Sequence, residues 1–386
     1  MSGPNSFRRH LLAVTESAAA AAPTRSAPHI RDGFSVERAM RYMIVALIPC
    51  IVMAFINTGF QANVDLAVVG VETAPGWRVA LLDQLGIGRN PYSLLANIAH
   101  GGLYFIPVLT VTVLVGSIWE RVFAKLRTRP LSVDLPVIAL LFTLSLPSSI
   151  PLWQAALGMS FAIVMGREIF GGSGRNFLNP VLVGLAFLYV TYPRDMIGET
   201  AWTMVDAFTS PTYLALAAQE GPGAISWLAM PWLYAFLGLA PGQMGSTSAL
   251  ACLIGGAFLL YTRIISGSIV AGMLLGTIVS ALVVNQFGNP ADNAFVTLNW
   301  SWHLLLGSFA FGAVFLATDP VSSAMTARGR WYYGLLIGIM VVLIRVASSS
   351  HPDGVMFAIL FGNMFAPLID YIVVWTHIRR RARRGV

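Results

Sequence analysis

Residues 267–286 read GSIVAGMLLGTIVSALVVNQ, a run of 20 positions without a charged side chain. A helix that crosses the hydrocarbon core of a bilayer needs about 20 mostly apolar residues. A second apolar run, residues 102–123 (GLYFIPVLTVTVLVGSIWERVF), carries charged side chains only near its end. Runs of this length and composition predict membrane-spanning helices.

The composition of the whole chain extends this prediction. Of its 386 residues, 56% are hydrophobic and 11% are charged, whereas soluble domains have about 45–50% apolar and about 25% charged residues. Soluble, disordered and fibrous classes are therefore excluded. The apolar residues suffice for about ten spans of the length that a bilayer needs. We expect an all-α polytopic membrane protein with about ten transmembrane helices.

The ten predicted spans follow the apolar runs along the chain. The third and fourth are short, and the segment between them, residues 147–151 (PSSIP), breaks any helix. Broken helices are tolerated at membrane depth where they are buried in protein or line a cavity. The predicted spans are residues 42–58, 102–123, 135–147, 151–166, 177–192, 246–262, 267–286, 302–318, 331–348 and 355–376.

The basic residues orient this layout. The formal net charge is +7, and with a cytoplasmic N-terminus 20 of the 24 Lys and Arg residues fall in cytoplasmic segments. Arg78, Arg89 and Arg194 lie outside, and Arg345 lies near the outer end of the ninth span. Lys and Arg concentrate on the cytoplasmic side of membrane proteins. Both termini are therefore predicted to be cytoplasmic, and basic clusters beside apolar spans do not indicate nucleic-acid binding.

The same layout divides the chain into three parts. Residues 1–41 form a cytoplasmic N-terminal arm, residues 42–376 form the transmembrane domain, and residues 377–386 form a basic cytoplasmic tail. Two long loops, residues 59–101 and 193–245, are placed on the periplasmic side.

A possible internal repeat links the two halves of the transmembrane domain. Residues 144–149 (LSLPSS) resemble residues 317–323 (ATDPVSS), and each segment precedes a long span and a later helix that carries asparagine. Five spans per copy would make the repeats inverted, and such repeats place binding sites near the midplane. Chance similarity between two turns rich in Pro and Ser explains the pattern equally well.

Common cofactor motifs are missing from the sequence. Its two cysteines, Cys50 and Cys252, are too few for an iron–sulfur cluster with its four ligands. The six His residues include no pair at helical spacing, and the chain contains neither GxGxxG nor a Walker loop. Any redox carrier in this chain must therefore be organic.

Acidic residues inside predicted spans are the first candidates for chemistry, since they are costly to place in a membrane. Glu120, Asp319 and Asp370 all lie toward the cytoplasmic side, where carboxylate oxygens could admit a cation. The alternative is helix capping or pairing with a neighbouring arginine. Pairing is the favoured interpretation for Glu120, which precedes Arg121, and both interpretations stay open for Asp319 and Asp370.

Two other segments carry unusual polar patterns. In residues 166–180 (GREIFGGSGRNFLNP), Asn176 and Asn179 would share a helix face and could bind a polar heterocycle stacked on Phe177 or Phe187. Composition alone favours a tight turn with capping asparagines. In the second periplasmic loop, residues 205–214 (VDAFTSPTYL) place small hydroxyls after an aspartate, which is an N-cap signal.

From about Arg31 to the C-terminus the chain resembles the NqrB/RnfD family, which includes the NqrB subunits of Na+-translocating NADH:quinone reductases (Nqr) and, more distantly, the RnfD subunits of Rnf complexes. The strings that carry the resemblance are residues 57–63 (NTGFQAN), 85–88 (LGIG), 151–158 (PLWQAALG), 170–180 and 351–361 (HPDGVMFAILF). The long loop at 59–101 favours the first of these two branches.

The resemblance implies a covalent flavin. Members of the family carry FMN on a threonine in an Asp-x-x-Ser/Thr-Gly-Ala-Thr motif, and the matching positions here are Asp206, Thr209 and Thr212. Thr212 would form the phosphoester. Ser210 and Pro211 depart from the family pattern, and because proline fixes φ and removes a backbone donor, they put efficient attachment of the flavin in doubt.

Further sites follow from the same resemblance. It implies riboflavin in the membrane, with Asn176, Asn179 and Phe187 as candidates, and ubiquinone near Gly116. It associates Glu120, Asp319 and Asp370 with Na+ uptake. Electrons would pass from NADH on another subunit through the flavins to ubiquinone, coupled to Na+ export, in a bacterial inner-membrane complex of subunits of the A to F types.

Three alternatives remain. The chain could be an RnfD-type subunit of an ion-translocating ferredoxin:NAD oxidoreductase, a flavin-free channel or transporter, or a structural anchor for redox partners. Carboxylates serve Na+ and H+ alike, so the residues do not identify the coupling ion.

Overall fold

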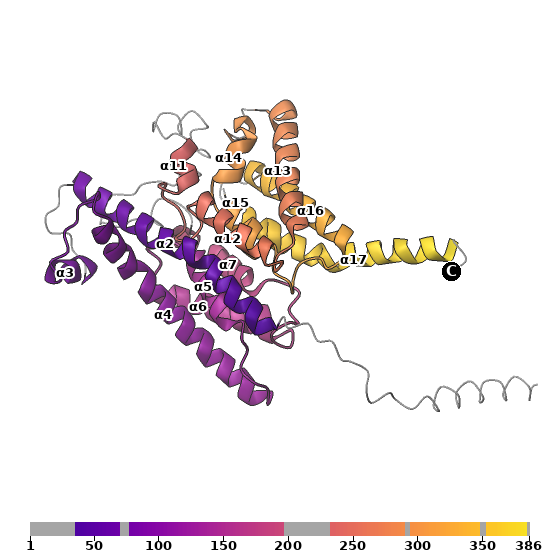
Figure 1. Ribbon diagram of the computed structural model, residues 1–386, viewed down its shortest axis with the longest axis horizontal. Coiled ribbons are helices and arrows are strands. Elements are labelled where there is room, and N and C mark those ends of the chain that lie inside the picture. Colours follow the sequence, from indigo (N-terminus) through magenta and orange to yellow (C-terminus); the bar gives the residue numbers. More distant parts are fainter. Residues whose placement is uncertain (1–34, 70–76, 197–231, 290–293, 348–352, 384–386) are drawn as a thin grey trace, which may run out of the picture. The chain divides into compact units, whose positions relative to one another are not determined.

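Helices make up all the regular secondary structure in the part of the chain that the structure describes, residues 35–69, 77–196, 232–289, 294–347 and 353–383 of a computed structural model (Figure 1). The chain divides into two units, Met1–Val36 and Glu37–Val386. Only the last two residues of the first unit are described, so the architecture below is that of the second.

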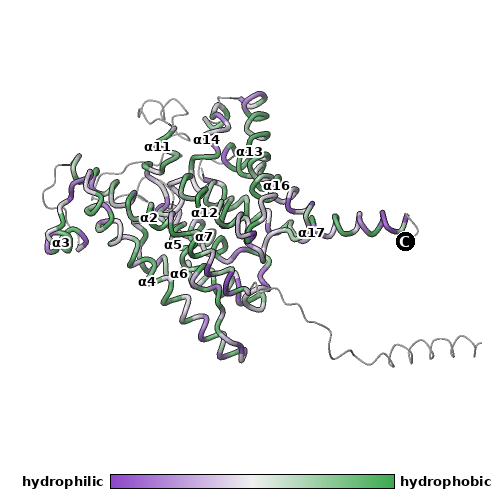
Figure 2. The backbone as a smooth tube through the Cα atoms, in the orientation of Figure 1, coloured by the Kyte–Doolittle hydropathy of each residue, from purple (hydrophilic) through white to green (hydrophobic). Residues whose placement is uncertain are grey.

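Five helices are long and apolar enough to cross a membrane by length and composition: α2 (Val36–Val69), α4 (Leu94–Leu126), α13 (Gly267–Phe287), α16 (Ala327–Ala347) and α17 (Val355–Arg383). Three shorter apolar helices accompany them: α5 (Leu135–Leu144), α7 (Pro180–Thr191) and α12 (Ala249–Tyr261). Figure 2 shows hydrophobic residues along most of these helices and hydrophilic residues toward the end of α17. The described part of the chain is thus all-helical, and its long apolar helices are those of a multi-pass membrane protein.

The remaining elements are short or irregular. The π-helix η1 (Val164–Glu168) continues α6 (Leu152–Ile163), and a second π-helix, η4 (Gly312–Leu316), continues α15 (Phe309–Phe311). The others are α3 (Trp77–Gln84), α8 (Pro193–Met196), α11 (Trp232–Leu237), the 3-10 helix η3 (Ala294–Thr297) and α14 (Trp300–Leu305).

Each predicted span contains helix. The eighth, residues 302–318, was expected to be one continuous helix, but it is broken. It breaks after Leu305 at Gly307, whose φ of 73° lies in the left-handed region. The first span is longer than predicted, and α17 continues through the basic residues to Arg383. Arginine is a good helix former, so the end of an apolar run does not mark the end of a helix.

The expected break between the third and fourth spans is confirmed. α5 ends at Leu144 and α6 begins at Leu152, and Leu146, Ser148 and Ile150 between them are buried. The carbonyl oxygen of Leu144 accepts a hydrogen bond of 2.7 Å from the backbone of Gly245. That contact satisfies a helix end that would otherwise be left without a partner.

Arg345 and Asp353 stabilise the second break, which lies between α14 and α15. Arg345 at the end of α16 is fully buried, and its guanidinium donates to the carbonyl oxygens of His303 (2.7 Å) and Leu306 (2.9 Å) at the end of α14. The carboxylate of Asp353 accepts from the backbone N–H (2.9 Å) and hydroxyl (2.5 Å) of Ser308, which precedes α15. Both ends of the broken helix therefore find partners inside the protein.

Opposed glycines bring α13 and α16 into close contact. A Cβ at Gly276 would lie 2.4 Å from the carbonyl oxygen of Leu335, and one at Gly338 would lie 2.2 Å from that of Met273. Gly272 and Gly334 complete a small-xxx-small pattern on each helix. Such patterns let membrane helices approach backbone to backbone, where van der Waals packing and interhelical hydrogen bonds drive association.

Arg345→Met is expected to lower the unfolding free energy by several kcal/mol, because two buried carbonyl oxygens lose their donors at about 1–3 kcal/mol each. Thermal unfolding of the purified full-length protein measures the effect. Arg328→Met on the same helix, where Arg328 is exposed, is the control and should change the midpoint little. Equal unfolding midpoints for the two variants would show that Arg345 does not stabilise the break between α14 and α15.

Candidate functional site

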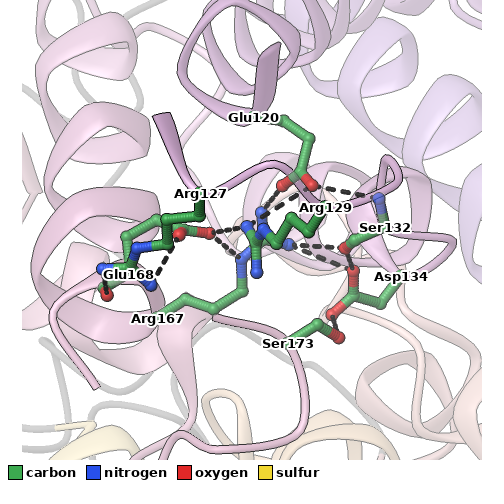
Figure 3. A network of polar contacts seen from close by, with 8 residues as sticks. All are labelled: Glu120, Arg127, Arg129, Ser132, Asp134, Arg167, Glu168 and Ser173. Atoms are coloured by element: carbon green, nitrogen blue, oxygen red, sulfur yellow. Dashed lines mark hydrogen bonds and ion pairs between the residues drawn. The ribbon is translucent and has the colours of Figure 1, made fainter. Parts of the chain in front are cut away.

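The last turns of α4 meet the end of α6–η1 in a cluster of charged residues (Figure 3), of which Glu120, Arg167 and Glu168 are buried and the others are partly exposed. Glu120 on α4 is fully buried, and its carboxylate pairs with the guanidinium of Arg167 in η1. It also lies 3.6 Å from Arg129 and accepts a hydrogen bond of 3.0 Å from the backbone of Ser132. Glu120 thus ties its helix to the loop that follows.

Glu168, the next residue of η1, ties the same loop from the other side. Its carboxylate accepts a hydrogen bond of 2.6 Å from Arg129 and lies 3.5 Å from Arg127. Arg127 also donates to the backbone oxygen of Glu168 at 2.6 Å. Arg167 in turn reaches Asp134, at the start of α5, at 3.0 Å.

These six residues balance in charge, since Glu120, Asp134 and Glu168 face Arg127, Arg129 and Arg167. Buried ions are tolerated when they are paired and hydrogen-bonded, and a buried pair that loses one partner costs about 3–5 kcal/mol. The negative charge of Glu120 is therefore already compensated. This arrangement matches the pairing interpretation of Glu120.

The partner of Glu120 is not Arg121, however. Arg121 is exposed, because neighbouring residues on a helix point in different directions and only those three or four apart face each other. The arginines that compensate Glu120 come from a loop and from another helix, and they are distant in sequence.

A glycine turn closes the cluster. Gly171, Gly172 and Gly174 all have positive φ, and a Cβ at Gly172 would lie 1.7 Å from a guanidinium nitrogen of Arg129. Ser173 in this turn donates to Asp134 at 2.7 Å. The glycines are required here for both the backbone conformation and the space that Arg129 occupies.

Asn176 and Asn179 follow this turn, and both are buried. They precede α7, which begins at Pro180, so they do not share a helix face, and the favoured interpretation, a tight turn with a capping asparagine, is confirmed. Asn176 donates to the carbonyl oxygen of Leu178 at 2.9 Å within the turn. Proline at the first helical position ends the preceding turn at Asn179, which becomes the N-cap.

Asn179 joins the two halves of the chain. Its amide oxygen accepts from the backbone N–H of Val181 at 3.0 Å, which caps α7, and its amide nitrogen donates to the carbonyl oxygen of Leu316 at 3.2 Å. Leu316 is the last residue of η4. The start of one helix and the end of another are thus satisfied by a single side chain.

The two aromatic candidates lie in different places. Phe187 stacks on Phe161 with ring centroids 4.4 Å apart, and it lies about 12 Å along the α7 axis from Asn179. Phe177 is adjacent to Asn176 and is 41% exposed, with its ring against that of Phe170 at 4.8 Å. The structure therefore brings Phe177, and not Phe187, to the turn formed by residues 176–179, the asparagine turn.

Gly116 lies one turn before Glu120 on α4 and is a close-packing position. A Cβ there would lie 2.7 Å from the side chain of Met159 on α6 and 2.9 Å from that of Leu135 on α5. Access for another molecule at this glycine would require Met159 to move, and methionine is the most adaptable apolar side chain for such movement.

Asp319 and Asp370 are bound by hydroxyls and backbone amides. Asp319 accepts from the hydroxyl of Ser322 at 2.7 Å. Asp370 on α17 accepts from the backbone N–H groups of Met325 (2.7 Å) and Thr326 (3.0 Å), which precede α16. Asp370 therefore places a negative charge at the N-terminus of α16, where the helix dipole favours it.

The three residues of the flavin motif, Asp206, Thr209 and Thr212, lie outside the described residues. Within the described ranges, no group of three or more His, Cys, Asp or Glu side chains could hold a metal ion.

Most of the charged cluster was not predicted from its residues in sequence. From the sequence, Arg127, Arg129 and Arg167 were predicted only to lie on the cytoplasmic side, and no role was predicted for Asp134 or Glu168. The sequence does carry a signal for such a cluster. An apolar run long enough to span a membrane ends in both acidic and basic residues, and a second segment of the same kind lies near it in the chain.

Glu168→Gln is expected to lower the unfolding free energy by at most about 3–5 kcal/mol, the cost of breaking a fully buried pair, because Arg129 and Arg127 lose their carboxylate partner but are partly exposed, and Arg167 keeps Glu120 and Asp134. The unfolding midpoint of the purified full-length protein in detergent measures this loss. Ser173→Ala, which removes one exposed hydrogen bond of the same cluster, should cost far less.

The double variant Glu168→Gln/Arg129→Gln restores the charge balance and should recover part of the loss. If the double variant loses as much unfolding free energy as the two single variants, Glu168→Gln and Arg129→Gln, lose in sum, the two residues are not coupled.

Comparison with known proteins identifies the family of this chain. The chain is 47% identical over 364 residues to the B-type subunit of the Na(+)-translocating NADH-quinone reductase of Pseudomonas aeruginosa (strain LESB58), covering 94% of this chain and 90% of the relative. Proteins with the same name from Azotobacter vinelandii (46% identical; 95% and 91%) and Chromohalobacter salexigens (45%; 94% and 87%) are also similar. A family profile described as NQR2, RnfD, RnfE matches residues 23–379. The chain therefore belongs to the NQR2, RnfD, RnfE family.

Proposed function

We propose that the chain is the membrane-embedded B-type subunit of a Na+-translocating NADH:quinone reductase, active only within that complex. The observation that carries this proposal is the 45–47% identity, over nearly the whole chain, to relatives with that name. The partners are the other subunits, of the A, C, D, E and F types, and the location is the bacterial inner membrane.

The proposed topology has ten crossings with both termini in the cytoplasm. Five long helices supply five of them, and α5, α6–η1, α7, α12 and α14–η4 supply the others as shorter or broken crossings. Burial of the two similar segments, Ser145 and Ser148 in one and Thr318 and Ser322 in the other, is consistent with equivalent places in two inverted repeats.

The proposed electron route uses two flavins and ubiquinone. Thr212, in the periplasmic loop, holds FMN through a phosphoester, and Asp206 and Thr209 belong to its attachment motif. The flavins supply the redox chemistry when bound, while the protein supplies orientation and electrostatics. NADH is oxidised on another subunit, because this sequence has no dinucleotide motif.

The asparagine turn is the proposed place for riboflavin. A buried amide at Asn176 beside a partly exposed ring at Phe177 fits the polar edge and the face of a flavin. Asn179, whose amide is engaged on both sides, would hold the turn in place. Phe187 stacks on Phe161 with one face, so it would contact the flavin ring only with its other face. Ubiquinone is proposed to approach the helix face at Gly116, near Trp119.

Asp319 and Asp370 are the proposed carboxylates of the Na+ route, since their partners are neutral hydroxyls and backbone amides. Glu120 is proposed to act differently. Its pairing with Arg129 and Arg167 makes it a structural tie next to the route, and it would bind a cation only if those arginines moved away.

Thr212→Ala is expected to abolish covalent flavin on the polypeptide, because no other side chain of the motif would form the phosphoester. In-gel fluorescence after denaturation and the mass of the peptide spanning residue 212 measure it. Thr203→Ala, in the same loop and outside the motif, should keep the flavin. A flavin on neither the wild-type chain nor the control would favour a flavin-free channel, transporter or anchor.

Asp370→Ala is expected to raise the Na+ concentration for half-maximal quinone reduction by the whole complex severalfold. Its control is Thr326→Ala, which weakens the same cap of α16 but keeps the carboxylate. If Asp370 were only a cap, both variants would lose stability and neither would change the Na+ dependence.

The same assay separates the Rnf branch from the proposed one. A member of the proposed complex supports Na+-dependent reduction of ubiquinone by NADH, whereas an RnfD-type protein would require electron exchange between ferredoxin and NAD. The relatives compared above carry the first name.

A further inference from the structure

A polar pocket of about 130 Å³ opens between the end of α12, the start of α13 and the start of α16. Its described lining residues include none of the charged cluster and none of the asparagine turn. Two arginines, Arg263 and Arg330, line it together with the hydroxyl residues Ser266, Thr318 and Ser323. Among the described residues that line it, none is acidic. The pocket therefore presents cationic groups and hydrogen-bond donors.

Within the described part of the chain, neither arginine forms an ion pair with a carboxylate. Asp319 is engaged by Ser322, and Asp370 by the backbone of Met325 and Thr326. Arg330 is held at the pocket by a long hydrogen bond of 3.4 Å from its Nε to the carbonyl oxygen of Ala324. The two guanidinium groups are thus not ion-paired within the described part of the chain.

The start of α13 adds to this positive character. Ser266 is the N-cap of α13, and its side chain forms no capping hydrogen bond with this helix of 21 residues. The free N–H groups of a first helical turn, together with the helix dipole, attract anions. Serine hydroxyls and guanidinium groups are the donors that bind phosphate oxygens, and arginine binds them in pairs.

The size of the pocket limits what it can hold. A protein cavity of about 150 Å³ accommodates one benzene molecule, so about 130 Å³ suffices for a phosphate group with its five heavy atoms. A nucleotide or a complete lipid would not fit inside. The bound group must therefore be a small anion, or the head of a larger molecule whose remainder lies outside.

The surroundings of the pocket indicate the depth at which it lies. Tyr261, Trp331 and Tyr332, which are close in sequence to the two arginines, are all exposed. Tyr and Trp gather at the level of the lipid headgroups. The arginines belong to the side that the charge distribution predicts to be cytoplasmic, and basic pockets between membrane helices on that side suit anionic headgroups.

We propose that this pocket binds the phosphate group of an anionic membrane phospholipid, with Arg263 and Arg330 as its charged ligands. The hydroxyls of Ser266 and Ser323 and the first amides of α13 supply further donors. The lipid tails lie along the exposed apolar residues outside the pocket. This site does not depend on the proposed redox function.

The test compares lipid retention by four forms of the full-length protein. The wild type, Arg263→Asn, Arg330→Gln and the control Arg328→Gln are exchanged into nanodiscs of phosphatidylglycerol and phosphatidylcholine in equal amounts, and native mass spectrometry counts the retained lipid. Asparagine is chosen at residue 263 because φ there is 57° and asparagine tolerates that conformation. Arg328 is exposed and does not line the pocket.

The wild type and Arg328→Gln should retain phosphatidylglycerol over phosphatidylcholine, and the two pocket variants should lose at least tenfold of that preference. No preference in the wild type overturns the proposal, whether or not the variants fold. Equal preference in all four forms overturns the assignment to this pocket.

A second arm separates the lipid from free phosphate. Inorganic phosphate is titrated into the wild type in detergent without phosphatidylglycerol, and the unfolding midpoint is measured. Stabilisation by phosphatidylglycerol at a much lower concentration than by inorganic phosphate supports a lipid headgroup. Stabilisation by inorganic phosphate alone would show that the pocket binds the free anion, and the lipid assignment would be wrong.

Discussion

Every polar backbone group at a helix end inside this apolar body needs a partner from the protein itself, because lipid hydrocarbon offers no hydrogen bonds. Short and broken helices increase the number of helix ends inside the protein. The carbonyl of Leu144 is satisfied by the backbone of Gly245, and those of His303 and Leu306 by Arg345. Asn179 satisfies the start of α7 and the end of η4 at once. The irregular segments are stable because these contacts exist.

The same contacts give the candidate sites their rigidity. The asparagine turn lies between the charged cluster on one side and the contact of Asn179 with Leu316 on the other, so its backbone is held at both ends. Asp370 is held by the amides that precede α16. The proposed role in positioning redox groups would need this kind of fixed support, since loosely held contact residues lose their geometry.

Individual residues show where prediction from the sequence succeeded and where it ended. The break between Leu144 and Leu152 was predictable, because two prolines in an apolar run exclude a continuous helix. The break at Gly307 was missed, because a single glycine in an apolar run is compatible with a membrane helix. Glu120 was correctly expected to pair with an arginine, but its partners Arg129 and Arg167 are separated from it by a loop and by another helix.

What the sequence determined by itself was the class of the protein. Apolar length sets the helices, basic residues predict their orientation, and long matching strings identify the family, since each of these is local along the chain. What only the tertiary structure decided was the set of partners. Asn179 met the end of η4, Asp370 met the start of α16, and Arg263 and Arg330 came to line one pocket. These pairings depend on how helices pack against one another, and residues far apart in sequence carry no local signal of that packing.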